Sequence, residues 1–227
     1  LVSISGATAG QAQADASNGH VASVSVVDSG RNLAQYWRAL RSMGNALTSV
    51  TKSDTGALAL SATGYQLAQA DGLLAKFAAD QHYSLSNASV AQSLQLGGES
   101  VVDRIDIVDD GDVVATQISD LTDLASGGKL HAITLNAGAR RIALQASQLS
   151  GAQSVLGLVS DGRYSLALDQ VAAADLGTLL AGNTKIASVQ VTADAAGIAS
   201  NLSALAAAGS KLTAIARTDA ADVALAL

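Results

Sequence analysis

The sequence predicts an α/β protein built as a repeat solenoid of β-strand and helix steps, with mostly parallel sheets and no disulfides. Segments with alternating apolar residues, as in strands, are followed by segments whose apolar residues are spaced as on one helix face. This succession recurs along the chain. Strands that alternate with helices usually pair in parallel through right-handed crossovers, and similar steps in series favour a solenoid. The alternative is a layered α/β sheet closed within the chain.

The repeat becomes visible when the chain is aligned with itself. Strand-like segments that begin near Val24, Ile105 and Val189 are 81 and 84 residues apart. Apolar residues follow each of them at positions i, i+4, i+7 and i+10, and these are Leu33, Trp37, Leu40 and Met43; Val114, Ile118, Leu121 and Leu124; and Ile198, Leu202, Leu205 and Ala208. We therefore predict one continuous solenoid that contains the end of a preceding repeat (1–20), repeat one (21–101), repeat two (102–184) and partial repeat three (185–227).

The first full repeat shows the order of the expected elements. The predicted elements are a strand at 23–28, a helix at 32–43, a strand at 46–52, a turn at 54–56, a strand at 57–61, a helix at 65–79, a strand at 82–86 and a short helix at 88–95, before the next repeat begins at 102–108. Residues rich in Gly, Asn and Asp separate most of these segments, as turns require.

Composition excludes several classes of protein. The chain has no cysteine, which excludes disulfides, zinc–thiolate sites and thiol catalysis. Its net charge of −6 argues against a nucleic-acid partner, because phosphate binding needs a basic surface. No apolar run approaches the ~20 residues of a membrane-spanning helix. Small apolar residues dominate and aromatic residues make up only 3% of the chain, which suits thin, stacked layers.

Acidic residues gather where predicted strands lead into helices. Asp28, Asp109 to Asp112 and Asp194 stand at this junction in the three repeats. We interpret these junctions, 28–32, 109–112 and 192–194, as helix N-caps, because a carboxylate or hydroxyl there accepts hydrogen bonds from free amides of the first turn. The alternative is a calcium site at Asp106, Asp109, Asp110 and Asp112, although their spacing is not that of an EF-hand or a calcium-binding β-roll.

Other residues nominate no chemistry. The three histidines, His20, His82 and His131, do not recur between repeats and lack metal-binding spacing. Trp37 is predicted to be core, since Ile118 and Leu202 stand at its position in the other repeats. Tyr83 and Tyr164 are predicted to share one strand position. We therefore predict no enzyme, no cofactor, and no catalytic, cofactor-binding or metal-binding residue.

The sequence of the repeats resembles that of a known kind of protein. Its pattern of Val-x-Val-x-Asp followed later by Lys-Leu-Thr-x-Ile-x-x-Thr-Asp, clearest at 211–219 and close at 47–54, is similar to tandem repeats of very large secreted bacterial surface proteins. These are adhesin-like or S-layer-like, and many resemble type I secretion substrates. The resemblance implies an extracellular location at the bacterial cell surface.

Two functions are expected from this resemblance. The first is a structural, self-assembling segment of a stalk, surface layer, matrix or filament. The alternative is an adhesive module that recognises a glycan or a partner protein. Val223-Ala-Leu225 repeats the alternation of Leu58-Ala-Leu60 and Ile142-Ala-Leu144. The chain thus begins and ends within a repeat, so self-association through open solenoid ends or neighbouring repeats is expected.

Overall fold

A computed structural model describes residues 1–223 and divides the chain into two compact units. Unit 1 comprises Leu1–Val108 and Leu124–Ala132, and unit 2 comprises Asp109–Asp123 and Ile133–Leu227. The alternating segment predicted at 223–225 lies largely outside the described residues. Among the described residues, no helix is both long and apolar enough to cross a membrane.

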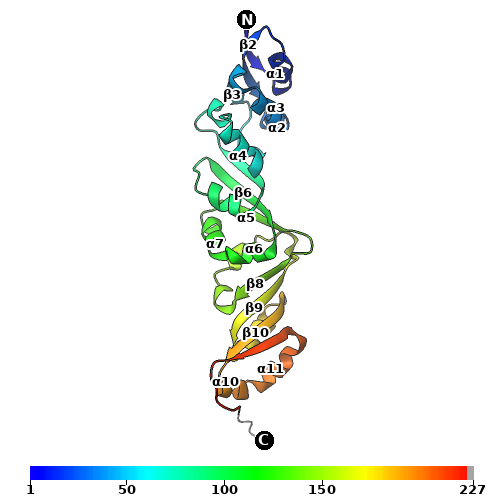
Figure 1. The fold of residues 1–227 in the computed structure, drawn as a ribbon, viewed down its shortest axis with the longest axis vertical. Helices are drawn as coiled ribbons and strands as arrows, with labels where there is room; N and C mark the ends of the chain where they lie inside the picture. The colour runs from blue at the N-terminus through cyan, green and yellow to red at the C-terminus, as the bar shows by residue number, and fades with distance from the viewer. Residues whose placement is uncertain (224–227) are drawn as a thin grey trace. The chain divides into compact units, whose positions relative to one another are not determined.

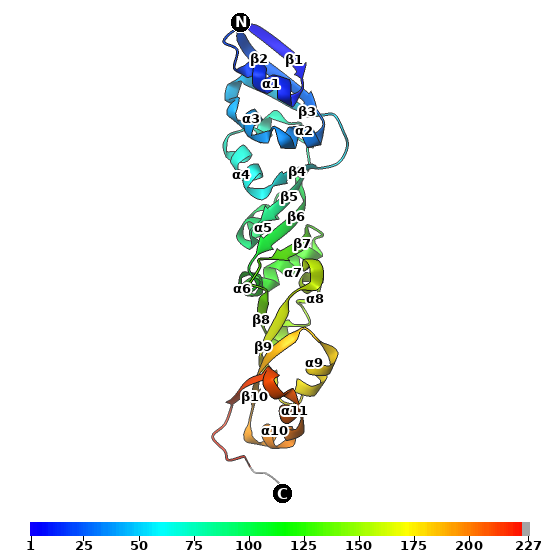
Figure 2. The same ribbon diagram turned by 90° about the vertical axis from the view of Figure 1, so that its right-hand side faces the viewer.

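The strands of unit 1 belong to two sheets, each covered by short helices (Figure 1). The elements that lie within unit 1 are β1 (Val2–Ala7), α1 (Ala9–Ala16), β2 (Val21–Asp28), α2 (Gly30–Gln35), α3 (Trp37–Ser42), η1 (Gly44–Ala46), β3 (Leu47–Lys52), β4 (Leu58–Ser61), α4 (Ala62–Ala70), η2 (Leu74–Lys76), β5 (Tyr83–Ala88) and α5 (Val90–Leu96). The first sheet has the order β1-β2-β3, and α1 lies against β1 and β2 (Figure 2).

Three further elements contribute residues to both units, and unit 2 holds the remaining ones. The shared elements are β6 (Val102–Asp109), α7 (Ile118–Ser126) and β7 (Leu130–Leu135). Those of unit 2 are α6 (Gly111–Thr116), β8 (Arg141–Gln145), η3 (Ala146–Gln148), α8 (Gln153–Leu156), η4 (Ser160–Gly162), β9 (Ser165–Ala172), α9 (Leu176–Gly182), β10 (Ile186–Ala193), α10 (Ala195–Ser200), α11 (Leu202–Ala208), η5 (Gly209–Lys211) and β11 (Leu212–Arg217).

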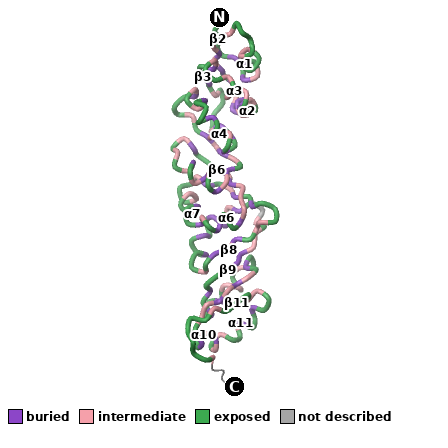
Figure 3. Tube along the Cα trace, in the orientation of Figure 1, coloured by how far each residue is buried: buried purple, intermediate pink, exposed green. Residues whose placement is uncertain are grey.

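The predicted α/β class and parallel pairing are confirmed. The second sheet has the order β4-β5-β6-β7 and the third the order β11-β10-β9-β8. The strands pair in parallel from β1 to β3, from β4 to β6 and from β8 to β11. Apolar residues alternate along these strands and are buried, and buried positions recur along the trace in Figure 3. The strands form three separate sheets, however, rather than one continuous sheet.

Two local predictions were wrong. The helix predicted at 32–43 is two short helices, α2 and α3, because the backbone at Tyr36 leaves helical geometry (φ −95°, ψ 13°). The helix predicted at 65–79 ends at Ala70 and is followed only by the 3-10 turn η2. The turn predicted at 54–56 is present as a bend, and it leads from β3 of the first sheet to β4 of the second.

The predicted equivalence of Tyr83 and Tyr164 was also wrong. In β5, Tyr83 pairs with Leu58 of β4, and the matching residue of β9 is Leu166, which pairs with Ile142 of β8. Tyr164 precedes β9. Both segments read Tyr-Ser-Leu, and a shift of two residues keeps every side chain on its face of the sheet, so the apolar pattern alone did not fix the register.

Candidate functional site

Carboxylates near the ends of three strands accept hydrogen bonds from helices that lie one β/α step earlier in the chain. In each case the donor is the backbone amide of the first residue of the helix. The pairs are Asp28 with Ala9 of α1 (2.9 Å), Asp54 with Gly30 of α2 (2.9 Å) and Asp219 with Ala195 of α10 (3.1 Å). Because neighbouring parallel strands end at the same edge, a carboxylate after one strand reaches the helix that follows its neighbour. Each carboxylate therefore ties two successive steps together.

Asp28 has the most complete set of partners. Burial raises its pKa, but the hydrogen bonds from the Ala9 amide, the Asn32 side chain and the Ser29 amide outweigh burial, so that the pKa lies below its ordinary value of 3.8. The N-cap of α2 is Ser29, whose hydroxyl accepts from the Asn32 amide. The predicted capping at this junction is therefore confirmed for the Ser29 hydroxyl, whereas the Asp28 carboxylate binds the first amide of the preceding helix.

The junction residues of the other two repeats differ from one another. Asp194 is the N-cap of α10 and accepts from the Gly197 amide at 2.6 Å, which confirms the predicted capping. Asp110 is the N-cap residue of α6 but makes no capping hydrogen bond with its side chain. Instead, its carboxylate accepts from the Asn136 side chain at 2.7 Å.

Three of the four residues of the calcium hypothesis, Asp106, Asp109 and Asp110, have protein partners. Asp106, in unit 1, pairs with Arg104 (3.0 Å) and His131 (3.2 Å). Asp109, Asp110 and Asp112 belong to unit 2, where Asp109 accepts from the Asp110 amide. Among the residues that the structure describes, no group of three or more His, Asp or Glu side chains could hold a metal ion. We therefore base no proposal on calcium.

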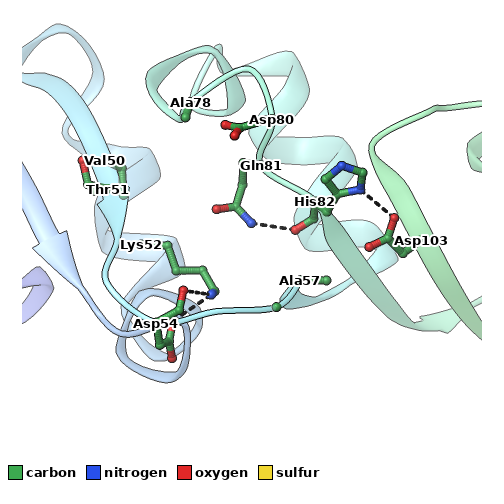
Figure 4. Close-up of a pocket in the computed structure, with 11 residues that line it drawn as sticks. Val50, Thr51, Lys52, Asp54, Ala57, Ala78, Asp80, Gln81, His82 and Asp103 are labelled. Atoms are coloured by element: carbon green, nitrogen blue, oxygen red, sulfur yellow. Dashed lines mark hydrogen bonds and ion pairs between the residues drawn. The ribbon is translucent and has the colours of Figure 1, made fainter.

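Unit 1 contains an open depression of about 520 Å³ (Figure 4). Its lining residues are Val50, Thr51, Lys52, Asp54, Gly56, Ala57, Ala78, Asp80, Gln81, His82 and Asp103. The Lys52 ammonium contacts the Asp54 carboxylate at 2.8 Å, and His82 Nδ1 lies 2.6 Å from Asp103 Oδ1. Figure 4 shows these two pairs apart from each other. Lys52 and Asp54 lie at and just after the end of β3, whereas His82 directly precedes β5 and Asp103 lies in β6.

The chemistry available in this depression is limited by these pairings. The hydrogen bond from Lys52, together with that from the Gly30 amide, lowers the pKa of Asp54 and holds it ionised. The His82 and Asp103 side chains are both about half exposed, at 47% and 48%, and exposed ion pairs contribute little free energy. The depression thus presents two side-chain pairs on separate walls, and we assign no reaction to it.

Four of the six aromatic residues form a cluster inside unit 1. Trp37 is 6% exposed, which confirms its predicted place in the core, and its ring centroid lies 5.6 Å from that of Phe77. Phe77 contacts Tyr83, which in turn contacts Tyr65 at 5.0 Å. The Trp37 indole N–H donates to the Gly64 carbonyl oxygen of α4. The cluster joins α3, which follows a strand of the first sheet, to elements that pack on the second.

Sequence reasoning missed two kinds of residue. Asp54 and Asp219 are the last residues of the two copies of the motif, at 47–54 and 211–219. This shared position was the sequence signal for their common role, which is to bind the first amide of an earlier helix. The second kind has a left-handed backbone within a strand. These residues are Gly6 in β1 (φ 69°), Asn87 in β5 (φ 54°) and Gln170 in β9 (φ 58°). Asn and Gln do not announce such a backbone in sequence as Gly does.

Comparison with known proteins adds no identification. Neither the protein-family models nor the curated proteins that were compared match the chain.

Proposed function

We propose that this chain is a structural, self-assembling segment of an extracellular bacterial surface protein, built of β/α steps that stack as a solenoid into a stalk, surface layer, matrix or filament. The bacterial and extracellular parts of this proposal rest on the resemblance of the repeat text. The structural part rests on how the residues at the strand and helix ends are used.

The observation that carries the proposal is the recurrence of structural positions. The first residue of the second short helix is Trp37 in α3, Ile118 in α7 and Leu202 in α11. The residue before each of them leaves helical geometry in the same way, with φ of −95°, −109° and −119°. A feature that recurs at successive, matching positions is explained by the packing of repeated steps.

The polar groups at the helix starts support the same interpretation. In unrelated α/β proteins, free amides at helix N-termini near the carboxyl ends of parallel strands bind anionic ligands. Here the first amides of α1, α2 and α10 are bound by Asp28, Asp54 and Asp219, and that of α6 by the Ala139 carbonyl oxygen at 2.7 Å. The chain thus provides hydrogen-bond acceptors for these amides from its own atoms, and the three carboxylates join one step to the next.

The adhesive alternative is less well supported. A sugar-binding platform would need aromatic side chains exposed at repeat spacing. Four of the six aromatic residues, Trp37, Tyr65, Phe77 and Tyr83, are instead buried against one another, with at most 8% exposure, and only Tyr36 and Tyr164 are partly exposed. A glycan array probed with the chain tests this alternative directly, and specific hits would favour it over a purely structural role.

Electron microscopy of the purified chain tests the proposal. At increasing concentration we expect regular assemblies whose far-UV circular dichroism stays that of the monomeric chain, since assembly should preserve the fold. Assemblies that bind thioflavin T would contradict this, because they would indicate cross-β aggregation of unfolded chains. Compact particles of constant size at every concentration would overturn self-assembly.

A further inference from the structure

Two asparagines occupy equivalent positions in turns that lead from a helix into a strand. Asn18 lies between α1 and β2, and Asn183 lies between α9 and β10. In each turn the asparagine Oδ1 accepts a hydrogen bond from the amide two residues later, that of His20 at 3.0 Å and that of Lys185 at 2.9 Å. Each asparagine carbonyl oxygen also accepts from the first amide of the following strand, at 2.9 Å before β2 and 3.3 Å before β10. The two turns therefore hold their asparagines in the same way.

The residue that follows the asparagine differs between the two turns. Asn18 is followed by Gly19 and Asn183 by Thr184, and Asn18 is the only one of the seven asparagines in the sequence that precedes a glycine. Gly19 is exposed, and within the described part of the chain its amide donates no hydrogen bond. Thr184 carries a β-branched side chain beside its amide nitrogen. The Gly19 nitrogen is therefore the more accessible of the two.

The hydrogen bond from the His20 amide also positions the atoms that can react. The ring that this bond closes contains both Asn18 Cγ and the Gly19 nitrogen, so these two atoms are held near each other. Asparagine is a thermally labile residue, because the next backbone nitrogen can displace its side-chain amide. Asn18 is exposed, so water reaches this turn as well.

We propose that Asn18 is a site of spontaneous deamidation, which proceeds through a succinimide formed with the Gly19 nitrogen. This nitrogen attacks Asn18 Cγ, the bond from Cγ to Nδ2 breaks, and ammonia leaves with the proton that the Gly19 nitrogen gives up. Water then opens the succinimide ring at either carbonyl, which gives aspartate or isoaspartate. Asn183 reacts far more slowly, because the Thr184 side chain hinders the same attack. The reaction does not depend on the proposed structural role.

Deamidation changes the turn in two ways. Both products carry a carboxylate, so each event adds one negative charge to a chain that is already acidic. Isoaspartate also adds a methylene group to the backbone directly before β2, where the first amide of the strand donates to the Asn18 carbonyl oxygen. The isoaspartate form should therefore loosen the start of β2, whereas the aspartate form keeps an acceptor for the His20 amide.

Peptide mapping by mass spectrometry of the folded chain, incubated at mildly alkaline pH, tests this proposal. We expect Asn18 to deamidate at least about tenfold faster than Asn183, because Gly19 lacks a side chain that hinders attack. Both isoaspartate and aspartate should form at position 18, and enzymatic methylation of isoaspartate distinguishes them. Equal rates at Asn18 and Asn183, or aspartate without isoaspartate at position 18, would overturn the proposal.

Two matched variants exchange the residues that follow the asparagines. Gly19→Thr should slow deamidation of Asn18 at least about tenfold, and Thr184→Gly should bring the rate at Asn183 close to that of Asn18 in the wild type. Both positions are exposed, the Gly19 backbone lies outside the left-handed region, and a Cβ atom built there has nothing within 4 Å. Both variants should therefore keep the circular dichroism of the wild type. An unchanged rate at Asn18 in Gly19→Thr would overturn the succinimide route, and an unchanged rate at Asn183 in Thr184→Gly would overturn the protective role of Thr184.

Discussion

Replacing Gly111 by alanine should destabilise the chain more than the same replacement at Gly30 or Gly177, which also lie in helices. Gly111 is the first residue of α6 and is buried against the segment that leads into β8. A Cβ atom at this position would lie 2.2 Å from the carbonyl oxygen of Arg141 and 2.8 Å from its carbonyl carbon. Ordinary contacts of this kind begin at 3.4 Å, so backbone on one side must move by about 1 Å.

The cost of this movement has two parts and one offset. Overpacking a close contact costs about 1–3 kcal/mol. The shift also strains the 2.7 Å hydrogen bond from the Gly111 amide to the Ala139 carbonyl oxygen, which adds about 1 kcal/mol. Alanine returns about 0.5–1 kcal/mol through its higher helix propensity. A net loss of about 1–3.5 kcal/mol follows, to be measured by urea unfolding followed by far-UV circular dichroism.

The two comparison glycines make this measurement decisive. Gly177 of α9 has nothing within 4 Å of a built Cβ, so Gly177→Ala should stabilise the chain by about 0.5–1 kcal/mol. At Gly30 of α2, the closest atom to a built Cβ is the flexible Lys52 Cε at 2.9 Å, so Gly30→Ala should cost less than Gly111→Ala. Equal stability of Gly111→Ala and Gly177→Ala, or a larger loss for Gly30→Ala, would refute the reasoning.

Three further predictions concern buried side chains. Phe77→Ala should cost about 3–5 kcal/mol by leaving a cavity beside Trp37, and fluorescence of this single tryptophan should report the loss as an earlier unfolding midpoint. Asp28→Asn should remove the stabilisation that the lowered pKa of this carboxylate provides. That stabilisation is present above the ordinary pKa of 3.8 and is lost as pH falls through the lower folded value, so the free energy of unfolding of the variant should depend less on pH in acid. An unchanged pH dependence would contradict this. Burial raises the pKa of Tyr83 to about 12, and this shift stabilises the fold below the ordinary pKa of 10. The stabilisation is lost as pH rises toward 12, so Tyr83→Phe should unfold less readily in alkali than the wild type. An ultraviolet titration of the variant should lack the late ionisation step of Tyr83.

The sequence predicted the elements best where periodicity alone decides them. Strands such as β2, β5 and β6 lie within one or two residues of their predicted positions. The reason is that strict alternation of apolar residues places them on one face of a strand but not on one face of a helix. The neighbours with which β3 and β4 pair, β2 and β5, were not predictable in the same way. A turn signal at 54–56 fits a hairpin as well as a crossing from one sheet to another, and only packing distinguishes the two.

The strand-end carboxylates show a second limit of local reasoning. A carboxylate just before a helix is normally assigned to that helix, since the nearest amides are those of its first turn. In a parallel sheet the start of the neighbouring helix lies equally close in space although it is about 20 residues away in sequence, as with Asp28 and Ala9. The choice between the two depends on sheet order and register, which a single sequence does not state.

The same carboxylates bear on function. The carboxyl edge of a parallel sheet is where α/β proteins usually place ligands, because helix N-termini there attract anions. Asp28, Asp54 and Asp219 occupy this position with the chain's own negative charge, each bound to a helix one step away. A ligand at these helix starts would have to displace an internal carboxylate that already joins two steps. This internal pairing therefore supports the proposed structural role over binding of a ligand at each of these helix starts.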